Sequence, residues 1–214
     1  MSLRQDFRNE HQLWTFTRQL SGILSGLLLL TACASATATP SPTPAATSNE
    51  RALGPADAPV TLVEYGDLGC TTCRAWYNSG VLDQIRAKYG DQVRFVWRDF
   101  PVITALSPKA AEAGWCAQDQ NKFWEVHDLV YAKFQIDEDS LKADAAQLGL
   151  DTARFSQCLD SGQHQQDVKR EWQDAQAHGF RATPSFLIND QTFIGPPTFD
   201  QLVSLIDPML AARN

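Results

Sequence analysis

Residues 59–73 have the sequence PVTLVEYGDLGCTTC, in which a β-branched run is followed by two cysteines three positions apart. The run at 59–65 predicts a buried strand. The helical spacing of apolar residues that follows predicts a helix over 72–89, with a kink at Gly80. Cys70 and Cys73 are therefore expected where a strand ends and a helix begins.

This position gives the two cysteines different chemistry. A cysteine at a helix N-terminus meets unpaired backbone N–H groups and the positive end of the helix dipole, which both stabilise a thiolate. Such cysteines have pKa values of roughly 3.5–7.5. We predict that Cys70 is the exposed nucleophile and that Cys73, further into the helix, is the buried thiol that resolves a mixed disulfide.

Two other interpretations of the CxxC motif are weaker. A zinc site needs four ligands, and Cys116 and Cys158 are far apart in the sequence with no histidine near either. A purely structural disulfide is disfavoured by the strand–CxxC–helix context. We therefore expect no metal site.

Glu64 lies on the first predicted strand and shares a face with Val60 and Leu62 by the two-residue period. A carboxylate that faces a core is unfavourable unless it has a partner or a role. We favour a buried proton acceptor for Cys73, with a pKa raised by desolvation. The alternative is a carboxylate at the strand end that reaches solvent.

The rest of the domain continues the α/β pattern. A second strand is predicted at 92–98, and only helical periodicity is found over 107–179. A hairpin is predicted at 185–188 and 192–194, followed by a helix from Thr198 that Pro208 bends or ends. Pro184 opens the first hairpin strand, where proline cannot donate to the sheet and where a cis peptide makes a tight turn.

Together these motifs resemble the DsbA-like thiol:disulfide oxidoreductases of the thioredoxin superfamily. The resemblance covers nearly the whole of 51–214. It implies an α/β thioredoxin fold with a helical subdomain inserted between the second strand and the cis-Pro strand. It also implies that a cis Thr183–Pro184 bond packs against the cysteine pair, and that the Thr183 backbone binds a substrate peptide. The matching residues are Asp57–Thr61, Glu64, Cys70–Cys73, Arg98–Pro101, Phe123–Asp128 and Thr183–Pro184.

Thr71 and Thr72 separate the cysteines and are counted, with Thr183 and Pro184, as substrate-binding residues. Members of the resembled family commonly have proline or histidine between the cysteines. A missing histidine removes a partner of the Cys70 thiolate, which favours a milder oxidant. The direction of electron flow, oxidase or reductase, therefore stays open.

The N-terminal segment is expected to be an export signal. Residues 20–32 form an apolar run of 13 residues, shorter than the ~20 that span a bilayer as a helix, so it fits the apolar region of a signal peptide. The end of the run, Leu30-Thr31-Ala32-Cys33, resembles a bacterial lipobox, which implies cleavage before Cys33 and lipidation of its sulfur. The alternative is an ordinary signal peptide cleaved after Ala34 or Ala36.

The chain is therefore divided into three parts: a lipoprotein-type signal peptide at 1–32, a lipid-anchored disordered tether at 33–50, and a domain at 51–214 with a helical insertion at about 106–179. The tether sequence is small, hydroxylated and interrupted by proline, a composition that cannot form a core.

The cysteine count is odd, five in 214 residues, and an exported protein must account for each one. Cys33 is assigned to the lipid and Cys70–Cys73 to exchange. Cys116 and Cys158 are expected to form a structural disulfide in the helical block, as in some DsbA-like relatives. Two buried free thiols and a second redox relay are the alternatives.

The histidines are expected to play no catalytic part. His127 lies on the apolar face of a predicted helix and is expected to be a core residue, while His178 precedes a glycine at a helix end. His164 has no sequence context that suggests a role.

The sequence thus predicts an extracytoplasmic, lipid-anchored thiol:disulfide oxidoreductase that oxidises cysteines in reduced exported proteins. Its other partner would be a membrane quinone-linked reoxidant or an electron donor. A reductase or isomerase of the same fold, and a metal chaperone that uses the CxxC thiolates, are the alternatives. A net charge of −7 argues against nucleic-acid binding. No cofactor is expected, and the protein is expected to be a monomer.

Overall fold

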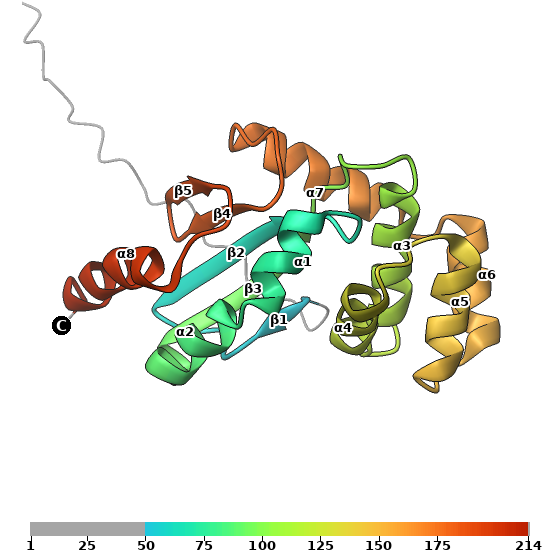
Figure 1. The fold of residues 1–214 in the computed structure, drawn as a ribbon, viewed down its shortest axis with the longest axis horizontal. Helices are drawn as coiled ribbons and strands as arrows, with labels where there is room; N and C mark the ends of the chain where they lie inside the picture. Colours follow the sequence, from blue (N-terminus) through green and yellow to red (C-terminus); the bar gives the residue numbers. More distant parts are fainter. Residues whose placement is uncertain (1–49, 214) are drawn as a thin grey trace, which may run out of the picture. The chain divides into compact units, whose positions relative to one another are not determined.

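The computed structural model describes residues 50–213, so the predicted signal peptide, Cys33 and most of the predicted tether lie outside the described residues. A five-stranded sheet has the order β1-β3-β2-β4-β5 (Figure 1). β2 and β3 are parallel and the other neighbours are antiparallel. The strands are β1 Ala52–Leu53, β2 Val60–Gly66, β3 Val93–Asp99, β4 Ser185–Ile188 and β5 Gln191–Ile194.

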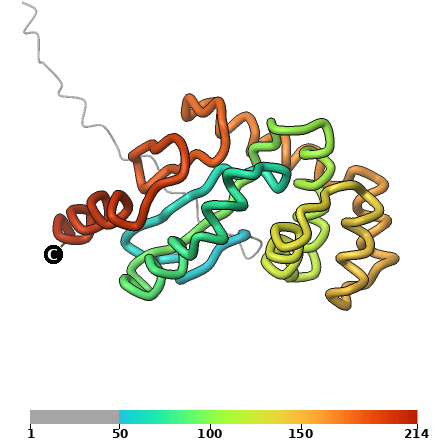
Figure 2. Tube along the Cα trace, in the orientation of Figure 1, coloured from blue at the N-terminus to red at the C-terminus, as the bar shows by residue number. Residues whose placement is uncertain are grey.

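Helices cover both faces of the sheet and continue beside it. α2 and α8 bury apolar side chains against one face, and α7 covers the other. α3, α4, α5 and α6 gather beside the sheet, next to α1 (Figures 1 and 2). The helices are α1 Thr71–Asn78, α2 Val81–Tyr89, α3 Ser107–Gln118, α4 Phe123–Lys133, α5 Glu138–Gln147, α6 Thr152–Ser161, α7 Gln165–Ala177 and α8 Phe199–Ala211, with a 3-10 turn at Gly90–Gln92.

The expected helix over 72–89 is two helices. α1 ends at Asn78 and α2 begins at Val81, because Gly80 has a φ of 73°. This left-handed conformation cannot continue an α-helix and favours glycine. Pro208, in contrast, lies inside α8, which continues to Ala211. The short β1 had no sequence signal.

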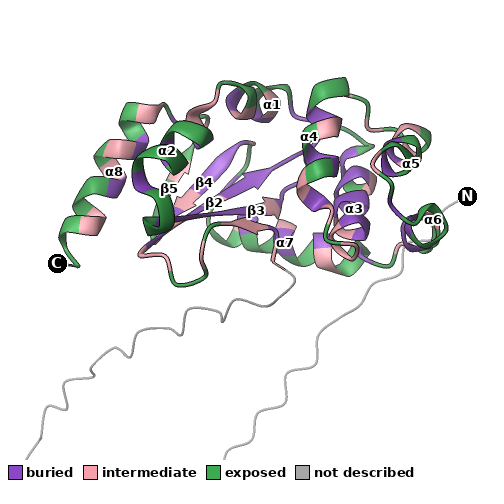
Figure 3. Ribbon diagram, turned by 90° about the horizontal axis from the view of Figure 1, so that it is seen from below, coloured by how far each residue is buried: buried purple, intermediate pink, exposed green. Residues whose placement is uncertain are grey.

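The core that positions the CxxC motif is formed jointly by the sheet and by the helical block of α3, α4, α5 and α6. Cys73 and Trp97 are fully buried and belong to the same apolar cluster as buried residues of α3–α6. β2 and β3 are largely buried in Figure 3. Trp97 lies so close to the end of β2 that a Cβ at Gly66 would approach it to 2.2 Å. No helix among residues 50–213 is long and apolar enough to cross a membrane.

Candidate active site

Cys70 caps the N-terminus of α1. Its backbone is extended, with φ −87° and ψ 117°, and its Sγ accepts a hydrogen bond from the Cys73 backbone N–H at 3.2 Å. On the other side, the Cys70 thiol lies 3.5 Å from the carbonyl oxygen of Thr183. The sulfur is therefore held between a helix start and the loop before β4.

The exposure expected for Cys70 is wrong. The residue is only 3% exposed, and Cys73 is 0% exposed. The loop that carries Thr183 covers Cys70 from one side, and Leu68 belongs to the same apolar cluster. Thr71 and Thr72, in contrast, are exposed. The two threonines therefore lie at the surface beside a sulfur that is itself covered.

The two thiols differ in acidity, and both cysteines are free in this structure. The hydrogen bond from the Cys73 thiol, helped by Thr183 and opposed by burial, lowers the pKa of Cys70 to about 6. Burial raises the pKa of Cys73, and the Cys70 thiolate and Glu64 raise it further. Cys70 is therefore the thiolate of the reduced pair at neutral pH, and Cys73 holds its proton.

Glu64 does not reach solvent. It lies on β2 between Trp97 of β3 and Phe186 of β4. The residue is 1% exposed, and its Oε1 has no hydrogen-bond partner among the described residues. Burial, and then the negative charge of Cys70, raise the pKa of Glu64 well above its ordinary value. The Glu64 carboxyl group, which lies near the cysteine pair, therefore keeps its proton to a higher pH than an ordinary glutamate.

Tyr131 is a second buried polar group at this place. Its hydroxyl, like Glu64 Oε1, has no hydrogen-bond partner among residues 50–213. Burial raises its pKa well above the ordinary value, and the charges of Cys73 and Glu64 add to this effect. The sequence shows Tyr131 only as one aromatic residue on the apolar stripe of a predicted helix, so no local signal connects it with the cysteines.

Asp67 joins the CxxC loop to the loop that follows β3. Its Oδ1 accepts a hydrogen bond from Gly69 N–H at 2.8 Å. Its Oδ2 accepts two more, from the N–H groups of Val102 at 2.8 Å and Ile103 at 2.9 Å. Asp67 was not a candidate in the sequence, because a GDxG stretch suggests only a turn.

The Thr183–Pro184 peptide bond is cis. Pro184 is buried, its carbonyl accepts a hydrogen bond from Gly195 N–H at 2.9 Å, and Thr183 Oγ1 is buried without a partner among the described residues. The structure thus brings together Cys70, Cys73, Glu64 and Thr183, with the exposed Thr71 and Thr72 at the rim.

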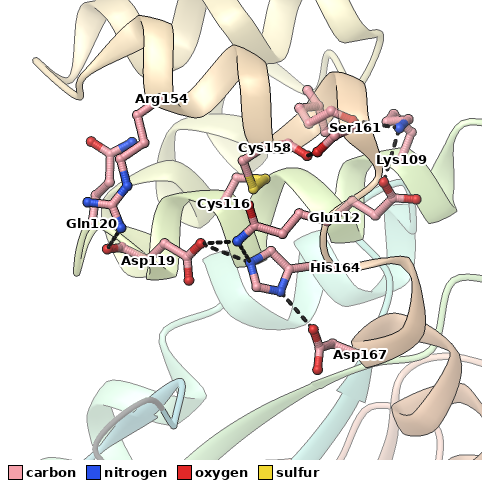
Figure 4. The surroundings of a disulfide bond; sticks show 12 residues. Lys109, Glu112, Cys116, Asp119, Gln120, Arg154, Cys158, Ser161, His164 and Asp167 are labelled. Atoms are coloured by element: carbon pink, nitrogen blue, oxygen red, sulfur yellow. Dashed lines mark hydrogen bonds and ion pairs between the residues drawn. A yellow bond between two sulfur atoms is a disulfide. The ribbon is translucent and has the colours of Figure 1, made fainter.

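Cys116 of α3 and Cys158 of α6 are joined by a disulfide, with their Cα atoms 5.9 Å apart. Contrary to expectation, a histidine lies near these cysteines. His164 lies next to the bridge in Figure 4, and its ring forms a cluster with Cys158 and Asp119. The turn between α6 and α7 brings it there, and His164 is only six positions after Cys158 in the sequence.

The two other histidines among residues 50–213, His127 and His178, have structural surroundings. His127 is 1% exposed, lies among Trp97, Tyr77 and Tyr131, and burial lowers its pKa. His178 is the C-cap of α7.

A strand that leads into CxxC at a helix start, opposite a cis-proline loop, defines a thioredoxin-like protein. A family model described as thioredoxin matches residues 46–208. The chain belongs to the thioredoxin family, and its fold is that of solved DsbA-type thiol-disulfide oxidoreductases.

Solved structures with this fold include BdbD from Bacillus subtilis, with a TM-score of 0.68 at 24% identity, covering 76% of this chain and 94% of that one. A thioredoxin-like oxidoreductase from Silicibacter pomeroyi DSS-3 has a TM-score of 0.68 at 27% identity, covering 77% and 94%.

Curated relatives are of two kinds. The Na(+)/H(+) antiporter NhaA of Herminiimonas arsenicoxydans is 38% identical over 143 residues, which are 66% of this chain but 22% of that protein. The chain thus spans less than a quarter of this relative, and the similarity concerns one segment of the antiporter. A protein of Bacillus anthracis named "Probable disulfide bond formation protein D" is 30% identical over 177 residues, 77% of this chain and 80% of the relative.

Proposed function

We propose that this protein is an extracytoplasmic thiol:disulfide oxidoreductase that introduces disulfides into reduced exported proteins through Cys70 and Cys73. The observation that carries the proposal is the difference between the two thiols: Cys70 has a pKa of about 6 and lies against Thr183, whereas the pKa of Cys73 is raised by burial. When a pair of this kind is reduced, Cys70 carries the negative charge of a thiolate and Cys73 carries a proton.

The reaction starts from the Cys70–Cys73 disulfide. A substrate thiolate attacks Cys70 Sγ, a bond forms between the two sulfurs, and the bond to Cys73 breaks. Cys73 leaves as a thiolate and takes up a proton. The second substrate thiolate then attacks the substrate sulfur of the mixed disulfide and releases Cys70 as a thiolate. The substrate loses two electrons, and the enzyme pair gains them.

Glu64 is proposed to supply the proton that Cys73 takes up. Its carboxyl group is buried, protonated more readily than usual and electrostatically coupled to Cys73. In the reverse reaction the same group accepts the Cys73 proton, as a general base. Tyr131 has an unpaired hydroxyl in the same surroundings and is proposed to position this proton.

The backbone of Thr183 is proposed to bind the substrate peptide as an added strand, next to Cys70.

The stabilised Cys70 thiolate supports the oxidase direction, because a stabilised reduced form makes a stronger oxidant. A pKa of about 6 lies between those of thioredoxin at ~7 and DsbA at ~3.5. The reduction potential of the Cys70–Cys73 pair therefore decides the direction.

A reductase of the same fold is the second candidate, and the absence of histidine between Cys70 and Cys73 favours it. The reduction potential separates the two: a value near about −270 mV supports the reductase and a value near about −120 mV the oxidase. A metal chaperone is disfavoured, because no histidine or methionine lies near Cys70 and Cys73 in the sequence.

The direct test uses Cys73→Ser and Cys70→Ser, each mixed with a reduced, unfolded substrate protein. Cys73→Ser, preloaded with a small disulfide on Cys70, should accumulate a mixed disulfide with the substrate on non-reducing gels. Cys70→Ser should form none and should not oxidise the substrate. If Cys70→Ser still oxidised it at the wild-type rate, the proposal would be wrong.

The location is proposed from the sequence of the N-terminus, which lies outside the described residues. Lipidation of Cys33 would hold the domain at a membrane, where a quinone-linked partner reoxidises the cysteine pair. The Cys33→Ser variant should then move from the membrane fraction to the soluble extracytoplasmic fraction. If the variant stayed with the membrane, the lipid anchor at Cys33 would be excluded.

A further inference from the structure

The surroundings of the Cys116–Cys158 bridge contain more than a disulfide (Figure 4). The ligand atoms of Asp119, Cys158 and His164 all lie within 4.8 Å of one another. Cys116 Sγ is bonded to Cys158 Sγ and adds a fourth donor at the same place. His164 is 8% exposed, and both cysteines are less exposed still. Two sulfurs, an imidazole and a carboxylate thus converge at a nearly closed position.

The ring of His164 is oriented as in a metal site. Its Nε2 points to Asp119 Oδ2 at 2.9 Å, and its Nδ1 points away from the bridge to Asp167 Oδ2 at 2.7 Å. Histidines that bind metals commonly donate their second ring N–H to a carboxylate, which fixes the ring and makes the free nitrogen a better ligand. The ring of Trp115 stacks on His164 at a centroid distance of 5.4 Å and holds its plane.

We propose that the Cys116–Cys158 bridge is a latent zinc site, which binds Zn²⁺ through Cys116, Cys158, His164 and Asp119 after a dithiol has reduced the disulfide. Two thiolates, one imidazole and one carboxylate are ligands that zinc takes in tetrahedral sites. Asp167 stays outside the ligand set as the partner of Nδ1. This inference is independent of the proposed function of Cys70 and Cys73.

The chemistry balances without an unnamed reactant. A dithiol gives two electrons and two protons to the bridge and becomes a disulfide, and the bridge becomes two thiols. Zn²⁺ then displaces the two thiol protons and binds the two thiolates, because a coordinating thiol is deprotonated by the metal. The metal then lies between His164 Nε2 and Asp119 Oδ2 and replaces the hydrogen bond that joins these two atoms when the bridge is oxidised.

The reduced sulfurs need to move only a short distance. Zn–S bonds of about 2.3 Å in a tetrahedral site place two sulfurs about 3.7 Å apart, a separation that side-chain rotation about fixed Cα atoms provides. The Gln163 amide must move, since its Nε2 lies 3.3 Å from His164 Nε2 and 3.0 Å from Asp119 Oδ2. Gln163 is exposed, so its amide can turn into solvent.

The test uses a full chain in which Cys33, Cys70 and Cys73 are replaced by serine, so that the bridge cysteines are its remaining thiols. One sample is reduced with a phosphine and one is left oxidised, and both are titrated with Zn²⁺ against a colorimetric chelator. We expect the reduced chain to bind one zinc ion at least ten times more tightly than the oxidised chain. His164→Gln should weaken binding at least tenfold, whereas the control His178→Gln should not change it.

Co²⁺ gives a second measurement on the chain with all its histidines. A thiolate-to-Co²⁺ charge-transfer band with intense visible bands is expected in the reduced chain, because tetrahedral thiolate sites have this spectrum. The proposal is overturned if the reduced chain binds zinc no better than the oxidised one, if His164→Gln binds as tightly as the parent, or if Co²⁺ binds without the thiolate band.

Discussion

Cys70 and Cys73 are one helical turn apart, and their environments give them opposite protonation states. Cys70 accepts hydrogen bonds at the start of α1, whereas Cys73 is fully buried beside Glu64. At the residue scale, therefore, the chemistry depends on the neighbouring titratable groups of Cys70, Cys73 and Glu64.

The pH dependence of Cys70 follows from its lowered pKa. Its folded value is about 6 and its ordinary value is 9.0, so between these pH values the unfolded reduced chain binds more protons than the folded one. The stability of the reduced protein should therefore rise with pH over this window, and this contribution should be lost below about pH 6. Alkylation of Cys70 by iodoacetamide should show the same midpoint. A midpoint near 9.0 would contradict the geometry.

Glu64→Gln should remove a buried titration. With a raised pKa, folded Glu64 holds its proton at pH values where the unfolded chain has lost it, so its contribution to stability falls as pH rises above its ordinary value of 4.5. The variant should thus become more stable relative to wild type as the pH rises from that value toward neutrality. Urea unfolding measures this, with the exposed Glu125→Gln as control.

The same variant should slow catalysis, since glutamine cannot give a proton to Cys73. We expect at least a tenfold slower oxidation of substrate, consistent with the ~10²–10⁴-fold contribution of general acid–base catalysis. Stopped-flow fluorescence with a reduced peptide measures the rate. A wild-type rate in Glu64→Gln would exclude the proposed proton transfer.

The sequence is sufficient for some of these residues and insufficient for others. The motif at 59–73 is local, so it predicts the strand, the helix start and the role of Cys70 without the rest of the chain. The burial of Cys70 depends on Thr183, more than a hundred residues away. Tyr131 reaches the cysteine pair only through helix packing, which no local pattern records.

At the scale of elements, the CxxC loop and the β3–α3 loop form one unit through Asp67. This second loop carries three exposed apolar side chains, Val102, Ile103 and Leu106, at 40%, 47% and 49% exposure. Its position next to the active site depends on the hydrogen bonds that Asp67 accepts from Val102 and Ile103.

Asp67→Ala should release both loops. Three backbone N–H groups lose a charged acceptor, and we expect a loss of about 2 kcal/mol or more. Hydrogen exchange should accelerate at Gly69, Val102 and Ile103, and denaturant unfolding measures the stability. Asp83→Ala, with a side chain that is 84% exposed, is the matched control and should change stability by less than about 0.5 kcal/mol.

Element boundaries show the same division between local and distant causes. The hairpin around Asn189 and the capping box of Thr198 at α8 have local signals, and both are found where the pattern places them. The end of α1 at Asn78 depends on a single backbone conformation at Gly80. Periodicity continues across that break, so it cannot show it.

At the scale of the whole molecule, Arg51 connects three separate parts of the chain. Its guanidinium is fully buried, pairs with Asp99 of β3 at 2.6 Å and with Glu171 of α7, and lies over the ring of Trp115 in α3 at 4.3 Å. Glu171 also accepts a hydrogen bond from the Asp99 backbone N–H at 2.6 Å. The sequence gives no sign of this network, since its members are 48 and 120 positions apart.

Arg51→Met should destabilise the domain by about 3–5 kcal/mol, because it takes the cation away from the buried Asp99 carboxylate and leaves Glu171 paired with Arg98. Adding Glu171→Gln should recover part of the loss. Guanidinium unfolding measures both. Arg86→Met is the control: its partner Asp83 is 4.0 Å away and both are exposed, so the change should be about 0–1 kcal/mol. Equal effects of the two variants would contradict the role of Arg51.

The shared core has a consequence for how the molecule opens. Cys73 and the Cys116–Cys158 bridge belong to one apolar cluster, and Tyr77 and Trp124 pack against both this cluster and the one under α2 and α8. Separating the helical block from the sheet would expose the apolar side chains of both clusters at once. The slowest-exchanging amides of β3 and of α3 should therefore exchange at one common rate, as parts of a single cooperative unit.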